Sequence, residues 1–74
     1  MDKYLNLGGN SSVEAYEIVE HSISVKFFKT NDTYIYSYAS TGKDDVERMK
    51  ILAKQGEGLN SYIMKHAKNT YEKP

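Results

Sequence analysis

Three tyrosines at alternate positions have the spacing most suggestive of chemistry in this 74-residue chain. Tyr34, Tyr36 and Tyr38 would share one face of a β-strand, because successive side chains of a strand point to opposite faces. If that face is open, its rings can stack nucleic-acid bases. If it meets the rest of the fold, the rings belong to the core and only their hydroxyls reach the rim. The burial of Tyr36 therefore separates a binding face from a core face.

Lysines that could bind phosphates accompany these rings. The candidate RNA site takes stacking from Tyr34 and Tyr36 and phosphate contacts from three lysines: Lys26, Lys65 and Lys68. Lys29 lies near the first of these in the sequence and could add a contact. The prediction concerns a local surface, because 10 basic residues balance 10 acidic ones in the whole chain. A strong nucleic-acid-binding domain usually has a basic excess.

The balanced charge is unevenly distributed along the chain. Residues 1–42 contain three basic and five acidic side chains, whereas residues 43–74 contain seven basic and five acidic ones. Residues 59–71 contain two lysines and His66 but no acidic residue. A basic face is therefore expected near the C-terminal end, where the sequence also predicts the last helix.

The sequence lacks a recognisable catalytic constellation. There is no cysteine, and His21 and His66 are the only histidines. Neither histidine belongs to a metal-binding spacing or has a thiol to activate. Asp44 and Asp45 are adjacent, so on a helix they point apart and serve the helix start instead. The sequence thus predicts a non-enzymatic protein with no cofactor and no metal site.

The first half of the chain has the alternation of β-strands. Residues 1–12 end in a Gly- and Ser-rich cluster and are expected to form a flexible arm, which leaves 13–72 as a single domain. Strands are predicted at Val13–Val19, at 23–28 and at 33–38, and turn chemistry at Asn31 and Asp32 favours a hairpin between the last two. The residues expected to face the core from the second strand are Ile23, Val25 and Phe27.

The second half has a helical period. Val46, Met49 and Ala53 form a stripe with Leu52 beside it, Thr41 is the predicted N-cap, and Gly56 is expected to end the helix. A second, shorter helix is expected from Gly58 or Leu59 to about Lys68. The residues predicted to lie on one side of it are Leu59, Tyr62, Ile63 and His66. The predicted fold is therefore α+β, with a three-stranded antiparallel sheet followed by two short helices on one face.

Four short motifs occur in the order of a known family. Tyr34-Ile35-Tyr36 resembles the YxY motif of the KTSC domain, and Ser11-Ser12 is similar to that family's opening Ser-Ser. Residues 56–63 resemble its segment of Gly, aromatic residue, Asn and Ile, although Leu59 replaces the aromatic residue. Tyr71 lies where the family commonly ends with an aromatic side chain. The resemblance covers residues 10–72.

This family is a small module of bacterial proteins that also occurs at the C-terminus of some lysyl-tRNA synthetases. The resemblance therefore implies the fold and, by association with the synthetase, RNA binding. Gly56 and Asn60 are its structural positions. We expect Asn60 to bond exposed backbone groups at the start of the second helix and to tie it to the sheet.

Two functions follow as hypotheses. The first is a non-enzymatic module that binds single-stranded or structured RNA. The second is a protein-interaction module that binds a peptide or a second copy through an edge strand or a groove between the helices. No apolar run is long enough for a membrane span and no signal peptide is recognisable, so a cytoplasmic protein without membrane contact is expected.

Overall fold

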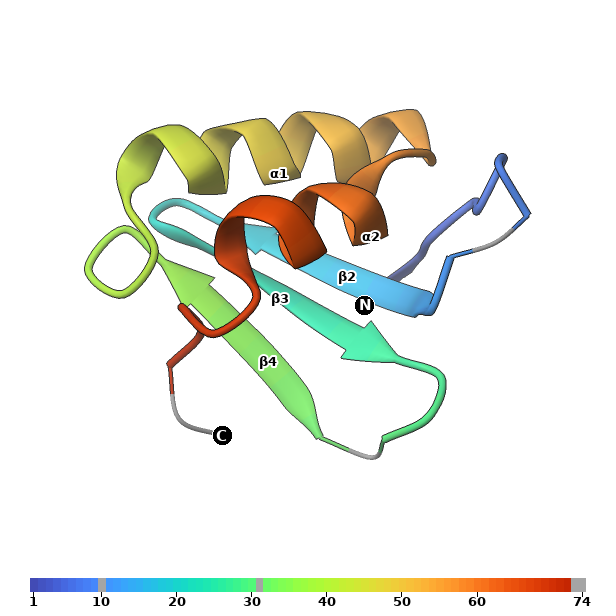
Figure 1. Cartoon of the computed structure of the whole chain (residues 1–74), viewed down its shortest axis with the longest axis horizontal. Coiled ribbons are helices and arrows are strands. Elements are labelled where there is room, and N and C mark those ends of the chain that lie inside the picture. Colours follow the sequence, from blue (N-terminus) through green and yellow to red (C-terminus); the bar gives the residue numbers. More distant parts are fainter. Residues whose placement is uncertain (10, 31, 73–74) are drawn as a thin grey trace.

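Helices cover one face of an antiparallel sheet in the computed structural model, which describes residues 1–9, 11–30 and 32–72. The four strands lie in the sheet in the order in which they occur along the chain, so each pairs with its neighbour in the sequence. Figure 1 shows the helices α1 (Lys43–Gln55) and α2 (Leu59–Tyr62) side by side on one face of this sheet. The predicted α+β class is confirmed. Within the described residues, no helix is both long and apolar enough to cross a membrane.

Strands β2 (Val13–Val19), β3 (Ser22–Phe27) and β4 (Thr33–Ser37) match the predicted strands within one residue. The predicted core face of β3 is confirmed, because Ile23 and Val25 are fully buried and Phe27 is 8% exposed. Phe28 lies beyond the strand and is 59% exposed. The proposed turn role of Asn31 falls outside the described residues.

The sheet has four strands where three were predicted. The additional strand β1 (Asp2–Lys3) pairs with β2 and comes from the segment expected to be a flexible arm. The next residue, Tyr4, is 2% exposed, and its N–H donates to the carbonyl of Glu14 at 3.0 Å. Burial of this large ring explains why the N-terminal segment is held against the sheet.

Helix α1 (Lys43–Gln55) buries Val46, Met49 and Ala53, as the predicted stripe requires. The predicted cap is wrong, because Gly42 is the N-cap residue and it has no side chain to bond the helix. The Thr41 hydroxyl instead lies 3.0 Å from both the carbonyl and the hydroxyl oxygen of Thr70. It therefore fastens the segment after the last helix to the loop before α1.

Gly56 ends α1 as predicted, in a left-handed conformation with φ 81°. Helix α2 (Leu59–Tyr62) then continues without interruption into the π-helix η1 (Ile63–Ala67). The buried residues along them are Leu59, Ile63 and Ala67.

His66 was predicted to lie on the same side as Leu59 and Ile63, but it is exposed. A π-helix bonds residue i to i+5, so each turn holds more residues than in an α-helix. The third residue after Ile63 therefore does not return to the buried face, whereas the fourth residue, Ala67, does.

Candidate functional site

The face that carries the tyrosines is the face that the helices cover. Tyr36 pairs with Ile23 in the sheet, shares its side, and is 2% exposed. Burial, followed by the charges of Tyr71 and Tyr34, raises the pKa of Tyr36 to about 12. The core interpretation is therefore right for Tyr36, and this ring offers no open surface on which a base could stack.

Tyr34 lies at the margin of this core and is half-buried. Its ring centroid is 4.6 Å from that of Tyr71 and 5.5 Å from that of Phe27. Tyr71 also meets Tyr36 edge-on, with centroids 6.1 Å apart. Tilted and edge-to-face pairs at these separations are favourable. The rings therefore form a continuous aromatic wall, made of Phe27, Tyr34, Tyr71 and Tyr36.

Tyr71 reaches this wall because the chain returns to the sheet after η1. The backbone N–H of Glu72 donates to the carbonyl oxygen of Ile35 at 2.6 Å, which adds a bridge to the free side of β4. Figure 1 shows the C-terminal segment passing from the last helix to this edge of the sheet. The contacts of Thr41 with Thr70 also hold this segment.

A groove of about 370 Å³ opens between this aromatic wall, η1 and the loop after β3. We call it the Tyr34–Lys68 groove. Its lining residues are Ser12, Phe27, Lys29, Thr30, Tyr34, Tyr36, Asn60, Met64, Lys68, Asn69 and Tyr71.

The lining combines positive charge with aromatic and apolar surface. Lys29 and Lys68 are both exposed and come from different elements, one from the loop after β3 and one from the end of η1. None of the described lining residues is an aspartate or glutamate. Met64, which is 48% exposed, supplies a flexible apolar contact. The groove therefore suits a ligand that is flat, partly apolar and negatively charged.

The structure brings together only part of the predicted RNA site. Tyr34, Tyr36 and Lys68 line one groove, together with Asn60. Lys26 lies elsewhere: it pairs with Thr33 on the opposite face of the sheet, and its ammonium is 2.8 Å from the carboxylate of Glu14.

Two further residues of the prediction lie outside the groove lining. Lys65 is exposed on η1 and does not line the groove. Gly56 is buried at the end of α1, where an added Cβ atom would lie 2.7 Å from the Cβ of Leu5. The structural role predicted for Gly56 is thus the one its position supports.

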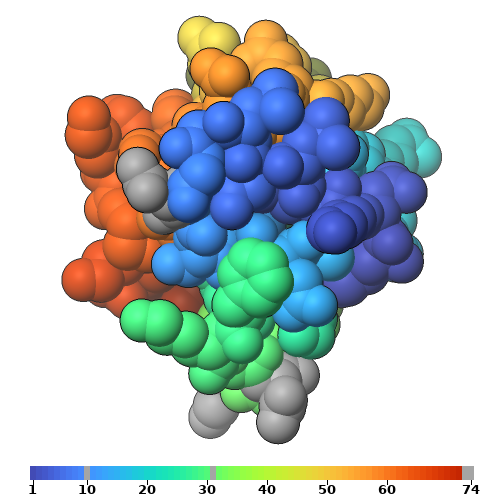
Figure 2. Space-filling view, turned by 90° about the vertical axis from the view of Figure 1, so that its right-hand side faces the viewer, coloured from blue at the N-terminus to red at the C-terminus, as the bar shows by residue number. Residues whose placement is uncertain are grey.

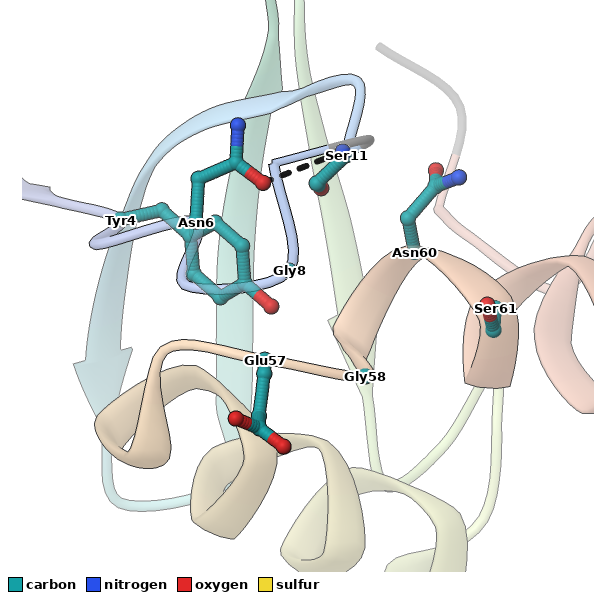
Figure 3. Close-up of a pocket in the computed structure, with 8 residues that line it drawn as sticks. All are labelled: Tyr4, Asn6, Gly8, Ser11, Glu57, Gly58, Asn60 and Ser61. Carbon is teal, nitrogen blue, oxygen red and sulfur yellow. Dashed lines mark hydrogen bonds between the residues drawn. The ribbon is translucent and has the colours of Figure 1, made fainter.

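Asn60 lies between the Tyr34–Lys68 groove and a second cavity, and it lines both. Its side chain was expected to bond backbone groups, yet it makes no hydrogen bond to any residue that the structure describes. The residue is half-buried. Figure 3 shows it projecting from the start of α2 on the side of Ser11. The amide is therefore available at the junction of two hollows.

The second cavity, of about 220 Å³, separates the N-terminal segment from the start of α2. Its lining residues are Tyr4, Asn6, Gly8, Ser11, Glu57, Gly58, Asn60 and Ser61. Figure 2 shows the N-terminal segment lying across this end of the molecule, between the residues after α1 and the loop after β3.

Two hydrogen bonds fix the wall of this cavity. The Tyr4 hydroxyl accepts from the N–H of Leu59 at 3.2 Å, and the side-chain oxygen of Asn6 accepts from the N–H of Ser11 at 3.1 Å. Figure 3 shows the second bond closing the loop above the cavity. The N-terminal segment, expected to be flexible, thus builds one side of a site.

The surfaces that a protein partner was expected to use are partly occupied by the chain itself. Strand β4 is bridged at Ile35 by Glu72, so a strand added there would have to displace the C-terminal segment. Between the helices, the Tyr62 hydroxyl donates to the carboxylate of Asp45 at 2.6 Å, and this bond raises the pKa of Tyr62. The bond joins α1 to α2 across the expected groove.

The two histidines lie on the surface, away from both cavities. His21 stands edge-on to Tyr38 at 5.2 Å, and its Nε2 is 3.6 Å from the carboxylate of the adjacent Glu20. The ring of His66 packs on that of Tyr62, with centroids 4.6 Å apart. Neither histidine lines the groove or the second cavity.

Sequence reasoning missed several lining residues. Phe27 was assigned to the core alone, Met64 and Asn69 were not singled out, and Tyr71 was noticed only through the family resemblance. Spacing in the sequence gives no signal for Tyr71, because its place depends on the path of the chain after η1. A search of known proteins adds no further signal, since no family model, curated protein or solved structure matches the chain.

Proposed function

We propose that the chain is a non-enzymatic binding module that takes single-stranded RNA in the Tyr34–Lys68 groove. One base would lie against the rings of Tyr34 and Tyr71, and the flanking phosphates would contact Lys29 and Lys68. The observation that carries this proposal is the composition of the groove, in which aromatic rings and two lysines meet without a described carboxylate. Bases stack on aromatic rings and phosphates pair with lysines in sites of this kind.

The proposed contacts differ from those expected from the sequence. Tyr71 takes the stacking role first given to Tyr36, because Tyr36 is only 2% exposed. Lys29 takes the place of Lys26, which is paired with Glu14. The resemblance to the KTSC domain supports the same proposal through the synthetases that carry that domain.

Salt dependence tests this proposal. Each phosphate neutralised on a single strand contributes about −0.7 to the slope of log affinity against log salt, so two lysines give about −1.4. With a mixed-sequence RNA of about ten nucleotides, Lys29→Gln and Lys68→Gln should each make the slope less steep by about 0.7. Lys54→Gln, at an exposed residue of α1 outside the groove, is the matched control and should keep the wild-type slope.

Two results would contradict the proposal. One is the absence of binding at low salt to a mixture of RNA sequences. The other is binding with a slope that neither groove variant changes. A peptide mixture that binds where RNA does not would favour the protein-interaction hypothesis instead.

A further inference from the structure

Asn60 carries a polar side chain that no described residue of the fold bonds. It stands at the junction of the Tyr34–Lys68 groove and the second cavity, and it makes no hydrogen bond to a described residue. Its neighbour Leu59 is the residue that ties α2 to the N-terminal segment, through Tyr4. The start of this helix is therefore anchored without the Asn60 amide, which leaves the amide available to a ligand.

The two hollows that meet at Asn60 differ in chemistry. The groove carries Lys29 and Lys68, whereas the described lining of the second cavity has no lysine or arginine and includes the exposed residue Glu57. A phosphate is favoured in the first and disfavoured in the second. A nucleotide with its phosphates over the groove would therefore turn the edge of its base toward Asn60 and the second cavity.

A carboxamide presents one acceptor and two donors close together. The Hoogsteen edge of adenine presents N7 as acceptor beside the N6 amine as donor, and asparagine pairs with both. Guanine presents two acceptors at that edge, which one carboxamide cannot satisfy in the same way.

We propose that Asn60 is the residue through which the chain selects among nucleobases, and that it selects adenine. The Asn60 amide N–H donates to N7, and its carbonyl oxygen accepts from the N6 amine. This inference rests on the proposed RNA binding and adds base specificity to it. One good bidentate contact accounts for a preference of about tenfold or more.

The test compares wild-type affinities for single-stranded oligoadenylate, oligouridylate and oligoguanylate of one length. We expect oligoadenylate to bind about tenfold more tightly than the other two. Asn60→Ala should bring the three affinities within about twofold of one another while the salt slope stays that of the wild type, because the lysines are unchanged. Ser24→Ala, on the opposite face of the sheet and outside both cavities, is the control and should keep the preference for adenine.

The outcomes separate this inference from the proposed function. If no oligonucleotide binds the wild-type protein, RNA binding itself fails. If all three bind the wild type equally, or if Asn60→Ala retains the preference for adenine, RNA binding stands and the role of Asn60 is overturned. The wild-type comparison decides the matter even if Asn60→Ala does not fold. Asn60→Ser then provides a second variant, with the same expected loss of preference.

Discussion

The hydroxyl of Tyr4 accepts a hydrogen bond from the backbone N–H of Leu59, 55 residues further along the chain. Both residues are buried, and Leu59 begins α2. The first residues of a helix have N–H groups without partners inside the helix, so a side chain from elsewhere must satisfy any that are buried. The N-terminal segment thereby fixes the helix that carries Asn60.

Tyr4→Phe should lower the free energy of unfolding by about 1–3 kcal/mol, because it leaves the buried N–H of Leu59 without a partner. Urea unfolding of the variant and the wild type measures the difference. Tyr16→Phe is the matched control, since the Tyr16 hydroxyl bonds no described residue, and it should be nearly neutral. Equal stability of Tyr4→Phe and the wild type would show that the bond does not hold the helix.

Gly56→Ala should destabilise the protein more than Gly58→Ala. Both glycines have left-handed backbones, with φ 81° and 84°, so alanine costs about 1–2 kcal/mol at either position. At Gly56 the added Cβ would also lie 2.7 Å from the Cβ of Leu5, whereas at Gly58 the nearest atom is 3.5 Å away. Gly56→Ala is therefore expected to lower the free energy of unfolding by about 1 kcal/mol or more beyond the loss caused by Gly58→Ala, as in other overpacked sites.

Thermal or urea unfolding of the two glycine variants gives this comparison directly. Backbone strain is shared between them, so the difference reports the contact of Leu5 with the end of α1. Equal losses of unfolding free energy in the two variants would mean that Leu5 does not limit the space at Gly56.

Glu47 is expected to make the stability of the protein depend on pH in the acidic range. The hydrogen bond from the Tyr38 hydroxyl, followed by that from Lys50 at 2.9 Å, lowers the pKa of Glu47 below its ordinary value of 4.5. A carboxyl whose pKa is lower in the folded state adds stability above its ordinary pKa and loses it as the pH falls through the folded value. Stability should therefore decline as the pH falls below 4.5.

Glu47→Gln should show a smaller decline over that range, because its amide does not titrate. Urea unfolding at a series of acidic pH values measures how the free energy of unfolding changes with pH. Glu17→Gln, at an exposed residue of β2, is the control. Equal acid sensitivity of Glu47→Gln and the wild type would place the responsible carboxyl elsewhere.

The elements whose pattern is local could be predicted from the sequence. The alternation of Ile23, Val25 and Phe27 follows from the pleat of a strand, and the stripe of Val46, Met49 and Ala53 follows from the turn of a helix. Each pattern depends only on neighbours in the chain. Strand β1 could not be predicted in this way, because two residues carry too little periodicity and Tyr4 is buried by contacts with distant segments.

The candidate site could be predicted only in part, for the same reason. Tyr34 and Lys68 were identified by residue type, but their meeting in one groove depends on the packing of η1 against the sheet. Lys26 lies only eight positions before Tyr34, yet the register puts it on the opposite face, beside Glu14. The return of Tyr71 to the sheet depends on the π-helical turn and the bridge between Glu72 and Ile35.

Nuclear magnetic resonance titration of the protein with a short single-stranded RNA at low salt tests RNA binding in the groove most directly. We expect the largest shifts at Lys29, Tyr34, Lys68 and Tyr71, and we expect them to disappear when salt is added. Shifts confined to the opposite face of the sheet, around Ser24, Lys26 and Thr33, would contradict RNA binding in the groove, as would the absence of any shift.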